Sequence, residues 1–151
     1  MHKNTTHIPE GSTPLLERFI NTLMHSGKKT IARRILKDCF IEVSKLSEGQ
    51  DPERIFEKAI ETVKPNMEVR PKRVGGAVYQ VPVEVKQNRQ LSLAFRWILG
   101  AARKEKGAPM SKKLARVLLD SSNETGPAFK KREDIHRMAQ ANKAFAHLAK
   151  Y

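Results

Sequence analysis

Residues 70–85 read RPKRVGGAVYQVPVEV, and this stretch decides the fold expected for the chain. Gly75 and Gly76 separate a basic arm from an arm in which apolar side chains alternate. A two-residue glycine loop suits the primed turns that match the twist of paired strands. We therefore expect a β-hairpin over about residues 67–85. Its base should pack on the rest of the chain while its tip projects, because an isolated two-stranded ribbon is marginal in water.

The predicted hairpin is basic and stands alone. Pairing across the loop sets Arg70 opposite Val81 and Lys72 opposite Tyr79. Each strand contains a proline, which cannot donate a ladder hydrogen bond, so neither strand can be central in a wider sheet. A projecting ribbon that carries Arg70, Lys72 and Arg73 has the shape and charge to enter a nucleic-acid groove. In the alternative interpretation, the glycines only make a tight turn and the charges only protect an edge from aggregation.

Outside the hairpin, apolar residues recur at helical spacing. This spacing, with its capping and stop residues, predicts helices from Thr13-Pro14 to Gly27, over Lys29–Leu46, from Asp51-Pro52 to Pro65, over 89–104, after a capping Ser111, and over 132–150. The stretch SSNETGP, residues 121–127, is expected to be a loop. The buried stripe of the second helix is predicted to be Ile31, Ile35, Cys39, Val43 and Leu46.

The fold class expected from these patterns is mainly α, with one protruding β-hairpin. We expect a single helical-bundle domain of about six helices over residues 13–151 and a flexible N-terminal segment over residues 1–12. A chain of 151 residues is long enough for one domain with its own core. The sequence shows no internal repeat, low-complexity tract or linker.

The charge of the chain indicates a polyanionic partner. The formal net charge is +13 and the pI is about 10.1, which points to nucleic acid or an anionic membrane surface. Residues 1–66 hold 11 Lys/Arg and 9 Asp/Glu, whereas residues 67–151 hold 18 and 7. The surface that faces the polyanion should therefore lie mostly in the second half of the chain.

Membrane and secretory functions find little support in the sequence. No apolar run approaches the roughly 20 residues that span a bilayer. The N-terminal MHKNTTHIPEGST has no apolar region of a signal peptide, and it lacks the arginine-rich amphipathic pattern of a transit peptide. The single cysteine excludes an intramolecular disulfide and favours a reducing compartment.

Residues 27–34, GKKTIARR, form a second basic cluster at the start of a predicted helix. The spacing is not that of a P-loop. Positive charge at this end opposes the helix dipole, which favours anions there. Lys28, Lys29, Arg33 and Arg34 are therefore candidates for contact with a phosphate backbone, and a solvated basic face is the alternative.

The sequence contains no catalytic constellation. Cys39 lies on a predicted apolar stripe and is expected to be a small core residue, not a nucleophile. His25, His136 and His147 have no metal-ligand spacing to other ligating residues. The acidic pair in KKRED, residues 130–134, is interpreted as local ion-pair partners. We therefore expect no enzyme, no metal and no cofactor.

Two further groups of residues could contact nucleic acid. Trp97 is expected in the core, and stacking on an exposed base is the alternative. The segment KKREDIHRMAQANKAFAH, residues 130–147, is dense in cations. In the alternative interpretation, these cations only form a solvated face of a helix. The candidates for phosphate neutralisation there are Lys130, Lys131, Arg132, Arg137 and Lys143.

Several segments, in their order and spacing, resemble one family. VGGAVYQVPVEV (74–85), LAFRWILGAARK (93–104) and KKREDIHRMAQANKAFAHLA (130–149) closely resemble small-subunit ribosomal protein seven of the bacterial and organellar type. FINTLMHSGKKTIARRIL (19–36) and VKPNMEVRPKRVGG (63–76) fit the same pattern. The resemblance covers about Leu15 to Ala149, nearly the whole chain.

The resemblance implies a fold and a function. Family members are helical bundles with a protruding β-hairpin, which agrees with the expectation above. The resemblance implies a structural protein that binds the head domain of small-subunit rRNA and nucleates head assembly. It also implies a location beside the exit-site tRNA and the mRNA exit path, next to small-subunit proteins eleven and nine.

The family's contacts can be carried over residue by residue. The resemblance implies rRNA binding by Lys28, Lys29, Arg33, Arg34, Arg70, Lys72, Arg73, Gly75, Gly76, Arg96, Arg103, Lys130, Lys131, Arg132 and Arg137. Residues near the tRNA and mRNA would be Val78, Tyr79, Gln80, Lys143 and His147.

Two features depart from the family pattern. Members usually begin with a run of arginines that contacts rRNA, whereas residues 1–13 here hold one lysine and no arginine. This difference points to an organelle, with the mitochondrion favoured over the plastid, or to a reduced genome, and a bacterial cytoplasm is the alternative location. The chain also stops at LAKY, without the aromatic and basic tail of relatives. An architectural DNA-binding protein with a basic β-ribbon arm remains the alternative function.

Overall fold

The structure, a computed structural model, describes residues 7–150. It is mainly helical with one two-stranded antiparallel hairpin, as the sequence predicted. Residues 1–6 of the predicted flexible segment lie outside the described residues. The elements are α1 (Pro14–Leu23), α2 (Lys29–Leu46), α3 (Pro52–Val63), β1 (Met67–Val74), β2 (Ala77–Glu84), α4 (Gln87–Lys104), α5 (Met110–Ser122), α6 (Gly126–Ala141) and the 3-10 helix η1 (Lys143–Lys150).

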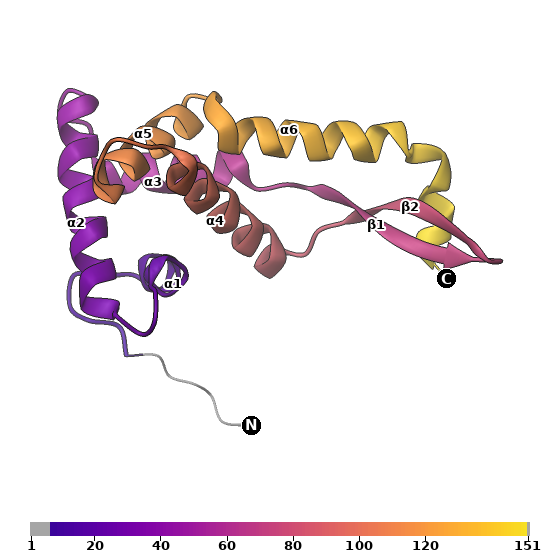
Figure 1. Cartoon of the computed structure of the whole chain (residues 1–151), viewed down its shortest axis with the longest axis horizontal. Coiled ribbons are helices and arrows are strands. Elements are labelled where there is room, and N and C mark those ends of the chain that lie inside the picture. The colour runs from indigo at the N-terminus through magenta and orange to yellow at the C-terminus, as the bar shows by residue number, and fades with distance from the viewer. Residues whose placement is uncertain (1–6, 151) are drawn as a thin grey trace.

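The molecule consists of a helical bundle and one long extension (Figure 1). Helices α1 to α5 form the bundle, and the hairpin leaves it and projects far to one side. Helix α6 runs out from the bundle beside the hairpin, and η1 folds down against β2. We call β1, β2 and their turn, Met67–Glu84, the arm. The arm is therefore accompanied along its length by the C-terminal segment, which the sequence did not predict.

Three phenylalanines hold the centre of the bundle together. Phe19 of α1 is fully buried and meets Phe56 of α3 and Phe95 of α4 edge to face, with ring centroids 5.0 and 5.1 Å apart. Such pairs contribute about 0.5–1.5 kcal/mol beyond their buried area. Leu114 and Leu118 of α5, both fully buried, close the same core.

The helix starts follow the predicted capping in two cases and differ in a third. The Thr13 hydroxyl oxygen accepts a hydrogen bond from the Leu16 amide at 3.2 Å, and Asp51 accepts one from the Glu53 amide at 3.1 Å. The prediction that Ser111 caps the fifth helix is wrong. Helix α5 already begins at Met110, and among residues 7–150 no side chain caps it.

The predicted buried stripe of α2 is partly wrong. Cys39 and Val43 are fully buried, but Ile31 and Leu46 are 46% and 50% exposed, and Ala32 and Leu36 are buried instead. Steps of four residues advance about 40° around a helix, so Ile31 lies about 80° from Cys39 and misses the core face. Leu46 is the last residue of α2, where the helix ends.

The end of the chain differs most from the prediction. The expected loop over 121–127 shrinks to three residues, because α5 continues to Ser122 and α6 begins at Gly126. Both serines of this stretch are buried at the end of α5, and the Ser122 hydroxyl donates to the Leu119 carbonyl at 2.7 Å. The predicted helix over 132–150 is in fact two helices. Asn142 ends α6, and its side chain donates to the Met138 carbonyl at 2.8 Å. Met138 itself is 48% exposed.

Candidate nucleic-acid interface

The turn of the arm has the geometry that the glycine pair predicted. Gly75 and Gly76 have φ of +59° and +84°, the left-handed region that a type I′ turn requires at both positions. The pairing sets Arg70 opposite Val81 and Lys72 opposite Tyr79, which confirms the predicted register. The tip from Arg73 to Val78 is exposed.

Arg73 is the cation of the arm that is available to a partner. Its side chain is exposed and makes no ion pair or hydrogen bond with any residue between 7 and 150. It lies directly beside the glycine turn, where the absence of Cβ atoms lets a phosphate or sugar approach the backbone closely. The neighbouring side chains Val74 and Val78 are 37% and 57% exposed.

Arg70 is held by an acidic residue that the sequence interpretation missed. Glu68 is 8% exposed and accepts hydrogen bonds from Arg70 Nε at 2.8 Å and from Arg89 Nε and Nη2 at 2.8 and 3.0 Å. Burial alone would raise the pKa of Glu68, but the hydrogen bonds from Arg89 and Arg70 outweigh it and keep the pKa lowered. The two-residue period of a strand places residues 68 and 70 on one face, so alternation could have revealed this pair.

Lys72 and Tyr79 face the C-terminal segment. The Lys72 ammonium donates to the Leu148 carbonyl at 2.7 Å, and the Tyr79 ring lies 5.2 Å from the ring of Phe145. Both residues are partly buried there. Lys72 was predicted to bind rRNA, and in this structure its charge is used within the chain.

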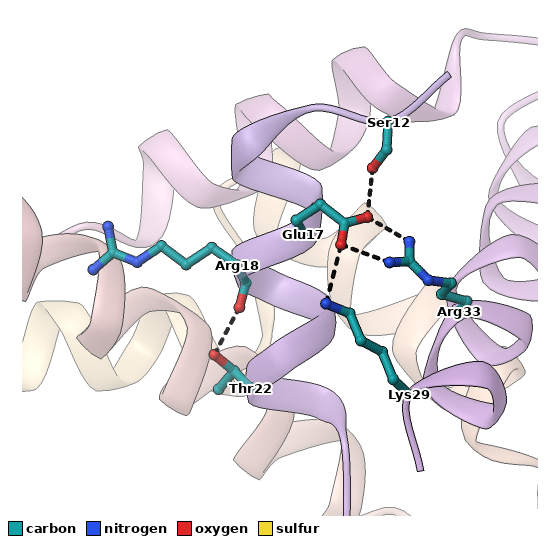
Figure 2. Close-up of polar contacts among 6 residues, drawn as sticks. All are labelled: Ser12, Glu17, Arg18, Thr22, Lys29 and Arg33. Atoms are coloured by element: carbon teal, nitrogen blue, oxygen red, sulfur yellow. Dashed lines mark hydrogen bonds and ion pairs between the residues drawn. The ribbon is translucent and has the colours of Figure 1, made fainter. Parts of the chain in front are cut away.

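The basic cluster of α2 surrounds a buried carboxylate (Figure 2). Glu17 of α1 is 2% exposed, and Arg33 and Lys29 of α2 converge on it while Arg18 points away. Arg33 makes a bidentate pair, with Nη1 on Oε1 and Nη2 on Oε2, the latter at 2.7 Å. Lys29 Nζ lies 3.3 Å from Oε2, and the Ser12 hydroxyl donates to Oε1 at 2.8 Å.

These contacts change the interpretation of the cluster. The hydrogen bond from Arg33 is the largest influence on Glu17, and with Ser12 and Lys29 it lowers the pKa of that carboxyl from 4.5 to about 2. Two of the four cations that oppose the α2 dipole therefore have an intramolecular reason to be there. Lys28 and Arg34 are exposed and have no partner in the described part of the chain.

The predicted residues of α4, α6 and η1 also fall into two groups. Several have partners within the chain: Arg103 donates to the Leu23 carbonyl at 3.5 Å, Arg132 to the Lys64 carbonyl at 3.0 Å, and Arg137 lies 3.3 Å from Asp134. Among the residues described, those that are exposed without such a partner are Arg96, Lys130, Lys131 and Lys143.

The arm and α6 lie side by side, so the structure brings their candidate residues onto one extension. Helix α2 stands at the opposite end of the molecule from the hairpin tip (Figure 1). The α2 cluster is therefore a separate surface. Trp97 is half-buried and packs against the core of the bundle, as expected.

Neither a metal centre nor a reactive thiol is found in the described chain. Between residues 7 and 150, no group of three or more His, Cys, Asp or Glu side chains is placed to hold a metal ion. Cys39 is buried, and burial raises the pKa of its thiol to about 12. Over the same residues, no helix has the length and hydropathy to span a membrane.

Comparison of the amino-acid sequence with known proteins shows which family the chain belongs to. The family model described as ribosomal protein S7p/S5e matches residues 2–143. The chain belongs to this family. One similar curated protein is the small ribosomal subunit protein uS7 of Rhodopirellula baltica, which is 54% identical over 93% of this chain and 90% of the relative. Another is the uS7 of Pseudothermotoga lettingae, which is 52% identical over 93% of this chain and 90% of the relative. The uS7 of Treponema denticola is 52% identical over 88% of this chain and 85% of the relative.

Membership in the S7p/S5e family decides two of the expectations from the sequence. The family consists of structural proteins and not of enzymes, so the prediction of a non-enzymatic protein is confirmed. The relatives named above are bacterial, and they give no support to the predicted preference for an organelle.

Proposed function

We propose that the chain is a structural component of the small ribosomal subunit that binds the head domain of its rRNA and nucleates head assembly. Family membership and the names of the relatives support this role. The observation that carries the proposal is the set of exposed cations on the arm, α6 and η1 that have no intramolecular partner in the described chain. These cations, among the described residues, are Arg73, Lys130, Lys131 and Lys143.

The proposed mechanism combines charge neutralisation with recognition of shape. The exposed cations neutralise phosphates, while the rigid bundle and the projecting arm select an RNA whose fold presents those phosphates in the matching positions. Phosphate contacts carry little sequence information, so the fold of the RNA supplies the specificity. Lys28 and Arg34 of α2 and Arg96 of α4 are proposed as further phosphate contacts on the bundle.

The tip of the arm and the far end of the C-terminal segment are proposed to lie near the exit-site tRNA and the mRNA exit path. Val78, Gln80, Lys143 and His147 are exposed and free to approach RNA. Tyr79 instead packs on Phe145 of η1 and supports the tip of the arm through that contact. Small-subunit proteins eleven and nine are the proposed protein neighbours. The bacterial relatives fit a ribosome in the bacterial cytoplasm.

Matched charge removals test the proposal. One variant carries Arg73→Gln, Lys130→Gln and Lys131→Gln, and the control carries Lys45→Gln, Arg54→Gln and Lys58→Gln, which removes the same charge from exposed sites on α2 and α3. Binding to labelled head rRNA is measured as a function of salt. Each lost phosphate contact should lower the slope of log binding constant against log salt concentration by about 0.7–0.9. The first variant, which loses three contacts, should therefore lose about 2.1–2.7 of this slope. Equal losses in both variants would contradict the proposed contact surface.

A further inference from the structure

The C-terminal segment fastens the base of the arm to the bundle. Arg132 Nε of α6 donates to the Lys64 carbonyl at 3.0 Å. One turn further, His136 Nε2 accepts a hydrogen bond from the Asn66 amide, also at 3.0 Å. Residues 64–66 form the only link between α3 and β1. Two side chains of α6 therefore hold the point where the arm leaves the bundle.

The same segment touches the arm again near its tip. The Lys72 ammonium of β1 donates to the Leu148 carbonyl at 2.7 Å, and Tyr79 of β2 packs on Phe145 with ring centroids 5.2 Å apart. These residues are cross-strand partners, so one rung of the arm carries both contacts. Residues 126–150, which we call the strut, thus meet the arm at its base and near its end (Figure 1).

Two contacts so far apart define the direction of the arm. Each strand has eight residues, which at about 3.3 Å per residue span roughly 26 Å. A tilt of about 20° at the base would then move the tip by about 9 Å, which exceeds the length of any hydrogen bond or ion pair. A two-stranded ribbon that had only its base contacts would not hold its direction in water.

We propose that the strut positions the arm for RNA binding, and that Lys72, Tyr79 and Phe145 are positioning residues. On this view Lys72 acts through the Leu148 carbonyl and not through a phosphate. Loss of a strut contact would leave every RNA-facing cation in place but would require binding to order a loosened arm. The part of this inference that concerns RNA rests on the function proposed above.

Phe145→Ala is the decisive variant because it removes a strut contact without changing charge. Spin labels on Ala77→Cys at the tip and Ile41→Cys on α2 report the distance from arm to bundle in the protein alone. Both sites are exposed, and the native Cys39 is buried. The parent protein should show one narrow distance distribution, and Phe145→Ala should broaden it. Met138→Ala, which truncates an exposed apolar side chain of α6, should leave it narrow.

RNA binding separates positioning from direct contact. Phe145→Ala should bind head rRNA about 10-fold more weakly with an unchanged salt slope, because the cost is the ordering of a segment and no phosphate contact is lost. Arg73→Gln should instead lower the slope by about 0.7–0.9 and keep the distance narrow. Lys72→Met should broaden the distance distribution, whereas Lys72→Arg, which keeps a donor, should leave it narrow. These two variants provide a second test if Phe145→Ala folds poorly.

The outcomes can be told apart from a failure of the proposed function. A narrow distance distribution in both Phe145→Ala and Lys72→Met would overturn the proposal that the strut positions the arm. A salt slope of rRNA binding that falls by about 0.7–0.9 in Phe145→Ala would overturn it as well. If the parent protein does not bind head rRNA, yet the two variants broaden the distance, the proposed function fails while the strut stands.

Discussion

Replacing Glu17 by glutamine should destabilise the bundle by removing a buried negative charge between two cations. The change keeps the size of the side chain, but an amide cannot pair with both Arg33 and Lys29. The lowering of the Glu17 pKa from 4.5 to about 2 corresponds to about 3 kcal/mol, since a tenfold change in proton affinity is about 1.4 kcal/mol. The side chains of Arg33 and Lys29 are 34% and 33% exposed, so water screens part of this energy. We therefore expect a loss of about 2 kcal/mol.

The effect should depend on pH in a defined direction. Glu17 has a lower pKa in the folded protein than in the unfolded chain, so its contribution is complete above pH 4.5 and disappears as the pH falls towards about 2. The difference in stability between the parent protein and Glu17→Gln should be constant near neutral pH. It should shrink through the window between 4.5 and about 2.

Urea unfolding followed by circular dichroism measures this difference at several pH values. At neutral pH the loss should also lower the melting temperature by about 4–8 °C. Glu61→Gln is the matched control, because Glu61 also pairs with a lysine, Lys64 at 2.6 Å, but its side chain is 70% exposed. The control should change stability by less than about 1 kcal/mol. A neutral-pH loss in Glu17→Gln no larger than in the control would refute the reasoning.

Three further outcomes follow from the structure. Cys39 should not react with a thiol reagent until the chain unfolds, because burial raises its pKa to about 12; rapid reaction of the native protein would contradict this. Gly126→Ala should lower the free energy of unfolding in urea by about 1–3 kcal/mol, because φ is +86° and the new Cβ would lie 2.9 Å from Asp120 Cβ. Gly100→Ala, in open space within α4, should instead raise the free energy of unfolding by up to about 1 kcal/mol. By NMR, the pKa of His136 should lie below 6.5, because burial, and to a smaller extent the charge of Arg132, lower it. The stability that depends on the neutral form of His136 should be lost as the pH falls below 6.5.

The hairpin was predictable because its determinants are local. The glycine pair decides the turn, the alternation of apolar residues decides the faces, and together they fix the register that the structure confirms. The bounds of α2 and the caps at Thr13 and Asp51 followed from similarly short-range signals.

The partners of the cations were not predictable in the same way. Arg33 and Glu17 are 16 residues apart, and Lys72 and Leu148 are 76 apart, so only the tertiary fold brings them together. The predicted site therefore included arginines and lysines that serve the fold as well as those that face outward. The break between α6 and η1 was missed because a 3-10 helix keeps nearly the same apolar spacing as an α-helix.

The most direct test of the central claim is a competition experiment at about 0.2 M salt, where generic attraction between charges is weakened. Labelled rRNA of the small-subunit head is bound to the full-length protein, and unlabelled duplex DNA is added in excess. Recognition of a folded RNA predicts that the DNA fails to displace the RNA. Displacement on equal terms would contradict the account, since the net charge of +13 would then bind any polyanion, as expected of an architectural DNA-binding protein.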